Sequence, residues 1–331
     1  MKTAPIPRFF LLPLSRRIVG LDLVRGCAIL AMTAYHQSLV NRPAGDWRLF
    51  AEFLGYASAP LFLVVSGVSA ALHERRHRRP LKMMVHGGLL FLMAYVIDLV
   101  LTRDPRVDWD IFQVIGACYA GLGLSGHLGR WPRKHLALAA VLLLVVVRPE
   151  LRPDKGFFSP WPYGFYFAGG YFAARLGLSP WLRRWSIRGL AAASLGFFLL
   201  DFSWNPPPDR TQPEGFIFIL ALALALLLAA LEAERRGRLR APGIGALVRC
   251  GRYPLTLYFA QQIAAVAHLR LPLPLTPTAA WAVQSTLLLA LMCAAAAVME
   301  RQAFLDAGWW LRQVEQRVLG LARAEGVAGR H

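Results

Sequence analysis

An arginine and a histidine lie eleven residues apart in the first apolar segment of the chain, at Arg25 and His36. At about 100° per residue, eleven helical steps return to within roughly 20° of the starting direction, so both side chains share one helix face about 16 Å apart. Asp22 lies three residues before Arg25 and can pair with it. Ionisable groups at membrane depth are costly and usually mark a substrate, ion or proton path. The alternative is a structural ion pair with a histidine at the membrane interface.

Two carboxylates and an amide also lie where apolar segments end or begin. Asp98 is near the end of one segment, and Asp110 and Gln113 open the next. Asp110 and Gln113 are three residues apart, so they share a helix face, and an aspartate at this depth needs a partner or a water-filled cavity. Because imidazole is the most common general base near neutral pH, His36 is the candidate base. Asp110 or Asp98 could orient its ring.

A second group of polar and aromatic residues completes the candidate set as substrate- or donor-binding positions. They are Asp46 and Trp47 in the loop after the first segment, Trp161 at the start of a later one, and Gln261 in the middle of another. Arg25 lies about 10 Å into its own segment, where a guanidinium could meet an anionic or carbonyl group that comes from the inner side. A base at the outer end suits an acceptor hydroxyl or amine. No Cys/His spacing indicates a metal site.

The segments that carry these residues are too apolar for a soluble domain. The chain is 56% hydrophobic and 17% charged, against about 45–50% and 25% in soluble domains. Apolar runs recur from residue 18 to residue 299, which is typical of a polytopic helical membrane protein. We therefore expect an all-α integral membrane protein with about ten transmembrane helices. They are 18–40, 50–72, 83–101, 111–128, 135–147, 159–178, 188–204, 214–231, 253–269 and 277–299.

Charge predicts the orientation of these spans. With ten spans and the amino terminus inside, the inner segments hold 27 of the 37 Lys and Arg residues, and the outer loops hold nine. The positive-inside rule then puts both termini in the cytosol and retains the short fifth span. The basic residues are spread over six short segments, which indicates no nucleic-acid partner. We expect a cytosolic lead-in at 1–17, a single transmembrane domain at 18–299 and a cytosolic amphipathic tail at 300–331.

The pattern Asp22-x-x-Arg25-Gly…His36 resembles the arginine-x10-histidine signature of the membrane acyltransferase-3 superfamily. Other stretches resemble the bacterial heparan-α-glucosaminide N-acetyltransferase-like branch of that group, and together they cover most of the chain. They are 60–69 (PLFLVVSGVS), 110–116 (DIFQVIG), 160–171 (PWPYG…GGY) and 251–258 (GRYPLTLY).

This resemblance implies acyl-CoA as donor, with acetyl-CoA the first candidate, and a sugar amine or hydroxyl as acceptor. It gives the catalytic role to His36 and a donor-side role to Arg25. The heparan branch has its active histidine in the loop after the first span, whereas Asn41–Trp47 contains none here, so His36 would have to serve. The ninth span also carries Gln261-Gln262 where relatives often have a histidine.

We therefore expect a bacterial inner-membrane acyltransferase that takes an acyl group from cytosolic acyl-CoA to an acceptor on the outer side. Its partners would be a small-molecule or glycan acceptor and the lipid bilayer, and a homodimer is left open. The alternative is a secondary transporter or a lipid/polyprenol flippase, since ten spans could form two inverted halves of five. Against it, the two halves contain no matching pair of spans broken by Gly or Pro.

Overall fold

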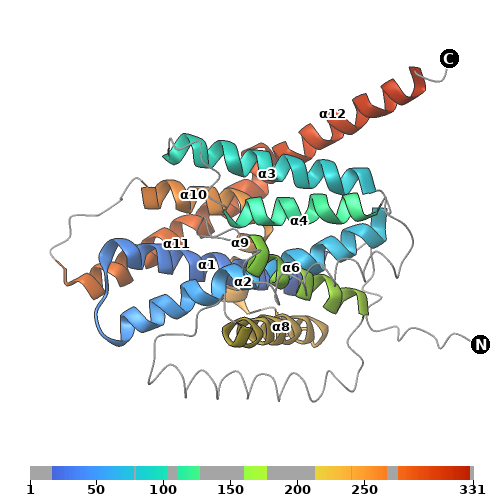
Figure 1. Cartoon of the computed structure of the whole chain (residues 1–331). Coiled ribbons are helices and arrows are strands. Elements are labelled where there is room, and N and C mark those ends of the chain that lie inside the picture. Colours follow the sequence, from blue (N-terminus) through green and yellow to red (C-terminus); the bar gives the residue numbers. More distant parts are fainter. Residues whose placement is uncertain are drawn as a thin grey trace, which may run out of the picture. The chain divides into compact units, whose positions relative to one another are not determined.

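The computed structural model describes residues 17–77, 80–102, 110–126, 160–176, 213–239, 241–266 and 275–328, which are largely helical and contain no β-strand (Figure 1). The chain divides into two compact units: Met1–Leu72 with Tyr166–Val298 (unit 1), and His73–Phe165 with Met299–His331 (unit 2). The helices are α1 (Val19–Asn41), α2 (Asp46–His77), α3 (Pro80–Thr102), α4 (Ile111–Ser125), α6 (Pro160–Leu176), α8 (Pro213–Arg235), α9 (Pro242–Arg252), α10 (Pro254–Val266), α11 (Pro277–Arg301), η3 (Ala303–Leu305) and α12 (Ala307–Ala328).

Three of the described helices are long and apolar enough to cross a membrane. They are α2 over Asp46–Arg76, α3 over Pro80–Leu101, and α11 over Pro277–Arg301. Helix α4 is also apolar but has only 15 residues. Helices α2, α3, α4 and α11 coincide with the second, third, fourth and tenth expected spans. In its described part, the chain is therefore an all-α membrane protein. The total of ten remains a prediction: the described helices within the expected spans 18–40, 159–178, 214–231 and 253–269 are not among the three that are long and apolar enough to cross a membrane, and the expected spans 135–147 and 188–204 lie outside the described residues.

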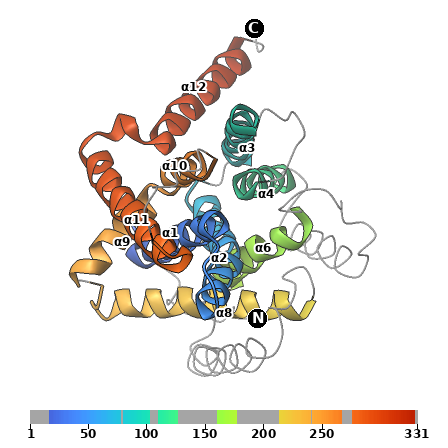
Figure 2. The same ribbon diagram turned by 90° about the vertical axis from the view of Figure 1, so that its left-hand side faces the viewer.

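Helix α1 lies in the middle of unit 1 and packs against α8, α9 and α10. Figure 2 looks nearly along α1, with α9 and α11 on one side and α2 on the other. Helix α8, expected as a span at 214–231, runs crosswise to α1 in the two views (Figures 1 and 2). The contact between α1 and α9 is close: a Cβ at Gly26 would collide with the carbonyl of Leu247, and one at Gly251 with the carbonyl of Asp22. Two glycines therefore allow these helices to touch backbone to backbone.

Glycines also allow a close contact between α2 and the part of α6 that belongs to unit 1. A Cβ at Gly67 of α2 would collide with the carbonyl of Phe167, and a Cβ at Gly170 of α6 would collide with the carbonyl of Val64. Gly67 belongs to the run Ser66–Ser69, whose small residues indicate close helix packing. This packing holds Ser69 on the α2 turn that faces α1.

Unit 2 contains α3, α4 and α12. Helices α3 and α4 approach closely because Gly87 and Gly116 face each other's backbone. Helix α12 covers part of the segment expected as an amphipathic tail, and it packs against α3. Glu315 of α12 is 5% exposed and accepts a hydrogen bond from the His86 ring at 2.9 Å, with the Lys82 ammonium 3.7 Å away. A buried ion pair thus fixes the tail on α3. The predicted cytosolic location of the tail is untested.

Candidate functional site

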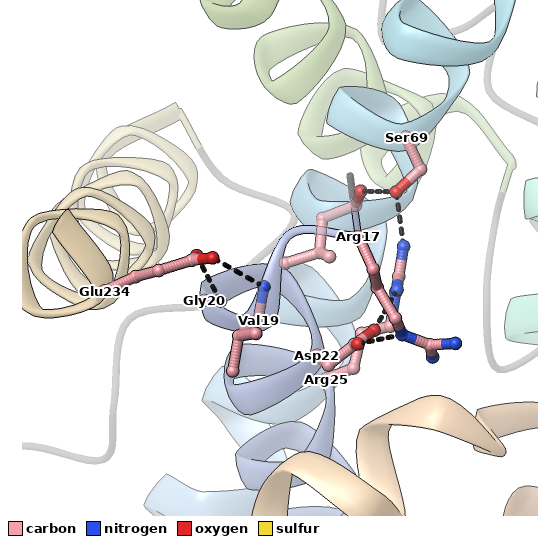
Figure 3. A network of polar contacts seen from close by, with 8 residues as sticks. Arg17, Val19, Gly20, Asp22, Arg25, Ser69 and Glu234 are labelled. Carbon is pink, nitrogen blue, oxygen red and sulfur yellow. Dashed lines mark hydrogen bonds and ion pairs between the residues drawn. The ribbon is translucent and has the colours of Figure 1, made fainter. Parts of the chain in front are cut away.

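The first site residue, Arg25, lies in the second turn of α1 and is held by two neighbours. Its Nη1 donates to Oδ1 of Asp22 at 3.0 Å, one turn earlier on the same helix. Its Nη2 donates to Oγ of Ser69 on α2 (Figure 3). The pairing of Arg25 with Asp22 that the spacing predicts is therefore present. Two fixed hydrogen bonds orient the planar guanidinium, so it is preorganised rather than free to rotate.

The carboxylate of Asp22 also accepts a hydrogen bond from a second guanidinium. Arg17 donates from Nε to Oδ2 at 2.5 Å, while the Asp22 side chain itself is only 3% exposed (Figure 3). One buried carboxylate is thus shared between two arginines. The guanidinium groups of Arg17 and Arg25 have N–H groups beyond those that bind Asp22 and Ser69, and these suit an anionic or strongly polarised ligand group.

The start of α1 is stabilised by a side chain from another helix. Ile18 at the N-cap offers no side-chain hydrogen bond, but Glu234 of α8 accepts from the backbone N–H groups of Val19 at 3.0 Å and Gly20 at 2.7 Å (Figure 3). A carboxylate at a helix N-terminus satisfies unpaired N–H groups and opposes the helix dipole. Glu234 therefore anchors the α1 end that presents Arg17 and Arg25.

His36 lies near the other end of α1, on the face that begins at Arg25. Its Nδ1 is buried, and among the described residues it has no hydrogen-bond partner. The ring lies 5.9 Å from that of Tyr35, which packs so tightly on α2 that a Cβ at Gly55 would overlap it. Within the described ranges, the imidazole is thus held by packing alone, and its nitrogen is available for a proton.

Asp98, Asp110 and Gln113 form a separate polar group in unit 2. Asp110 is the N-cap of α4: its side chain accepts from the Ile111 N–H at 2.5 Å, and Gln113 accepts from the Asp110 N–H at 3.2 Å, which completes a capping box. Gln113 also donates to Asp98 at 3.2 Å. These contacts give Asp110 and Gln113 a structural role in starting α4. His36 belongs to unit 1, so the predicted orientation of its ring by Asp98 or Asp110 stays a prediction.

The remaining candidates occupy different surroundings. Asp46 and Trp47 are exposed at the start of α2, and the Trp47 ring lies 5.9 Å from that of Trp281. Gln261 of α10 is buried, and Thr33 of α1 lies 2.8 Å from its Oε1. Trp161 falls in α6, but its side chain is outside the described part of the structure.

Three residues of the Arg25 cluster were not singled out by sequence reasoning. Arg17 counted only as an inner basic residue, and Ser69 only as a small residue for helix packing. Glu234 carried no local signal, because its partners lie more than 200 residues away in the chain. In the described ranges, no group of three His, Cys, Asp or Glu side chains could hold a metal ion.

Residues 17–151 match the family model described as heparan-alpha-glucosaminide N-acetyltransferase, catalytic. The match includes α1 to α4 and therefore Arg25, Ser69, His36 and the α4 capping box. No curated protein matches the chain. The first part of the chain is thus similar to a membrane acetyltransferase domain, in agreement with the resemblance in its sequence.

Proposed function

We propose that the protein is a membrane-embedded acyltransferase that moves an acyl group, acetyl in the simplest case, from acyl-CoA to a sugar amine or hydroxyl. The observation that carries the proposal is the arrangement on α1. Arg25 is fixed by Asp22 and Ser69, and His36, on the same face, has a buried Nδ1 without a partner in the described residues. Both lie in the stretch that is similar to the acetyltransferase catalytic domain.

The Arg25 end of α1 would receive the donor. The guanidinium groups of Arg17 and Arg25 would bind the phosphates of acyl-CoA, and its acyl thioester would extend along α1 toward His36, about 16 Å away. Asp22 and Ser69 would keep the Arg25 guanidinium in place before the donor arrives, so that less conformational entropy is lost when it binds.

His36 would act as the general base. It takes a proton from the acceptor hydroxyl or amine, whose oxygen or nitrogen attacks the thioester carbon. The carbon–sulfur bond then breaks, and the thiolate of CoA leaves with that proton. The products are the acylated acceptor and free CoA thiol, so atoms and charges balance without a metal or another co-reactant.

The orientation of the reaction follows from the charge distribution. With 27 Lys and Arg residues in the inner segments and nine in the outer loops, the ten-span arrangement puts both termini in the cytosol of a bacterial inner membrane. The Arg25 end of α1 would then be cytosolic, where acyl-CoA is made, and the His36 end would face the acceptor outside.

The rival function is a secondary transporter or lipid/polyprenol flippase. A transporter needs two compartments to do net work, whereas an acyltransferase turns over in detergent. Release of CoA thiol by purified protein, with acetyl-CoA and an amino sugar present, therefore separates the two classes. No feature of the described helices favours the transporter.

The decisive experiment compares wild type with His36→Ala in the CoA-release assay. Loss of a general base lowers turnover by about 10²–10⁴-fold. Cys27→Ala is the matched control, because Cys27 lies on the same helix but is exposed; we expect its activity to equal that of wild type. Full activity of a well-folded His36→Ala protein would contradict the assignment.

A further inference from the structure

Five uncharged polar residues line the contact between α1, α10 and α11 in unit 1. We call this set the polar seam, and its members are Thr33, Gln37, Gln261, Gln284 and Ser285. All five are buried. Uncharged amide and hydroxyl groups at such a depth need hydrogen-bond partners, because water is excluded there.

The contacts between the helices bring these residues together. Thr33 lies 3.4 Å from the Met292 sulfur, and Asn41 donates to Gln284 at 2.8 Å, so α1 and α11 run antiparallel. Gln37 lies one helical turn from both Thr33 and Asn41, and it therefore faces α11 between these two contacts.

The two other seam residues lie on α10 and α11. Gln261 of α10 reaches Thr33 at 2.8 Å. Ser285 lies one turn after Trp281, whose ring N–H donates to the carbonyl of Ala34 at 2.8 Å. Ser285 consequently faces α1, as Trp281 does.

Three seam atoms have no partner among the described residues: Gln37 Oε1, Gln261 Nε2 and Ser285 Oγ. The exposed fractions of these residues are 3%, 1% and 6%. For Gln261 the contact with Thr33 does not remove the shortage. Thr33 has a single proton and lies 2.8 Å from both the Ile29 carbonyl and Oε1 of Gln261, and it leaves Nε2 of Gln261 without an acceptor.

A native core rarely leaves polar groups unsatisfied, and here three such groups lie along the contact of α1 with α10 and α11. They offer an acceptor, an amide and a hydroxyl, a set that complements the hydroxyl groups of a sugar, each of which both donates and accepts. No seam residue carries a charge, which favours a neutral ligand over a phosphate or carboxylate. The seam residues of α1 are Thr33 and Gln37, beside His36 and away from Arg25.

We propose that the polar seam binds the hydroxyl groups of a neutral sugar ring of the acceptor, through Gln37, Gln261 and Ser285. This rests on the proposed acyltransferase function, since it gives the acceptor a place beside His36. The exposed Trp47, against Trp281 at the end of the same helix pair, lies where such a ring would arrive.

The test uses the purified full chain in a detergent without a sugar headgroup, such as lauryldimethylamine oxide, because a maltoside would compete. Thermal unfolding is measured with and without N-acetylglucosamine, glucosamine and glucose, in the absence of acetyl-CoA. We expect at least one sugar to raise the unfolding temperature of wild type. Gln37→Leu and Ser285→Ala should remove that rise without lowering the unfolding temperature of the sugar-free protein, because each replaces an unsatisfied polar group. Gln261→Leu should also remove the rise, but it loses the contact with Thr33 as well.

Gln262→Leu is the matched control for Gln261→Leu. Gln262 is the next residue of α10, and its Nε2 donates to the Tyr258 hydroxyl at 2.7 Å. Its loss should lower the unfolding temperature of the free protein but preserve the rise that the sugar causes. In turnover assays, the seam variants should raise KM for glucosamine about tenfold for each lost hydrogen bond, with KM for acetyl-CoA unchanged.

Three other outcomes overturn the seam as a sugar site, and a fourth separates it from the proposed function. No sugar effect on wild type, or an equal effect on the seam variants, removes the proposal. An increase in KM for acetyl-CoA alone would assign the seam to the pantetheine arm of the donor. Destabilised seam variants whose sugar response is intact would indicate bridging water only. Sugar binding that depends on the seam, without CoA release, would retain the site and remove the acyltransferase function.

Discussion

Nη1 of Arg25 lies 3.0 Å from Oδ1 of Asp22, and the two residues are one turn apart on α1. The same carboxylate binds Arg17, and Nη2 of Arg25 donates to the hydroxyl of Ser69. Arg25 is therefore committed to two neighbours at a fixed geometry before any ligand is bound. A substitution at Arg25 should therefore test the planar shape of the guanidinium as well as its charge.

Replacement of Arg25 by lysine should lower acyl transfer by at least about tenfold, because an ammonium cannot copy the planar fork that reaches both Asp22 and Ser69. We expect a higher KM for acetyl-CoA together with a lower kcat in the CoA-release assay. Arg48→Lys is the control: Arg48 pairs with Glu52 on the exposed part of α2, and its replacement should change turnover by less than about twofold. Equal kinetics for Arg25→Lys and wild type would leave Arg25 a structural residue.

Replacement of Asp22 by asparagine should destabilise the folded protein. The buried carboxylate faces two arginines, and loss of its charge leaves the Arg25 guanidinium partly buried without a counterion. Removal of one partner from a buried ion pair costs about 3–5 kcal/mol, and the exposure of Arg17 places the expected loss near the lower limit. Unfolding titrations in SDS would measure it. Glu52→Gln, at a more exposed pair, should change little, and a neutral result for Asp22→Asn would mean that the pair contributes no stability.

Local patterns predicted the parts of the fold that depend on local physics. The apolar runs 50–72, 83–101 and 277–299 became α2, α3 and α11, since length and hydropathy alone define such helices. Helix α9 was missed, because its 11 residues lie in a basic stretch that was interpreted as a loop. Its position against α1 depends on Gly26 and Gly251, which become informative only when the two helices are seen to cross.

In the candidate site, too, contacts within one segment were predictable and contacts between distant segments were not. The pair Asp22–Arg25 followed from a spacing of three residues, and the α4 capping box could have been read from the Asp-x-x-Gln pattern at Asp110 and Gln113. The contact of Arg25 with Ser69 could not be predicted from the sequence, because the two residues are 44 positions apart. Contacts at such separations depend on helix packing, and no pattern within one segment contains them.

The attachment of α12 to α3 should weaken in acid. Burial alone would raise the pKa of Glu315, but the hydrogen bond and charge of His86, with the charges of Lys82 and His73, lower it below its ordinary value of 4.5. A carboxyl group whose pKa is lowered on folding contributes stability above the unfolded value and loses it as pH falls through the folded value. The attachment should therefore weaken as the pH falls below 4.5.

A nitroxide on Arg317→Cys, an exposed position of α12, would report this change as an increase in mobility below pH 4.5. Because Glu315→Gln removes the titrating group, the mobility in that variant should be higher at neutral pH and independent of pH in the same range. Mobility that stays low in acid, or a pH response that survives in Glu315→Gln, would show that another group holds the tail.

Both termini should be cytosolic, and the loop between α1 and α2 should face outward, because 27 Lys and Arg residues lie in the inner segments and nine in the outer loops. The test places single cysteines at Ala44, in that loop, and at Arg238, between α8 and α9. Both positions are exposed. In a background without the four native cysteines, an impermeant thiol reagent on intact cells should label position 44 but not position 238. The reverse pattern would put His36 on the cytosolic side and overturn a mechanism with donor inside and acceptor outside. Labelling of both positions would change the number of spans between them from odd to even.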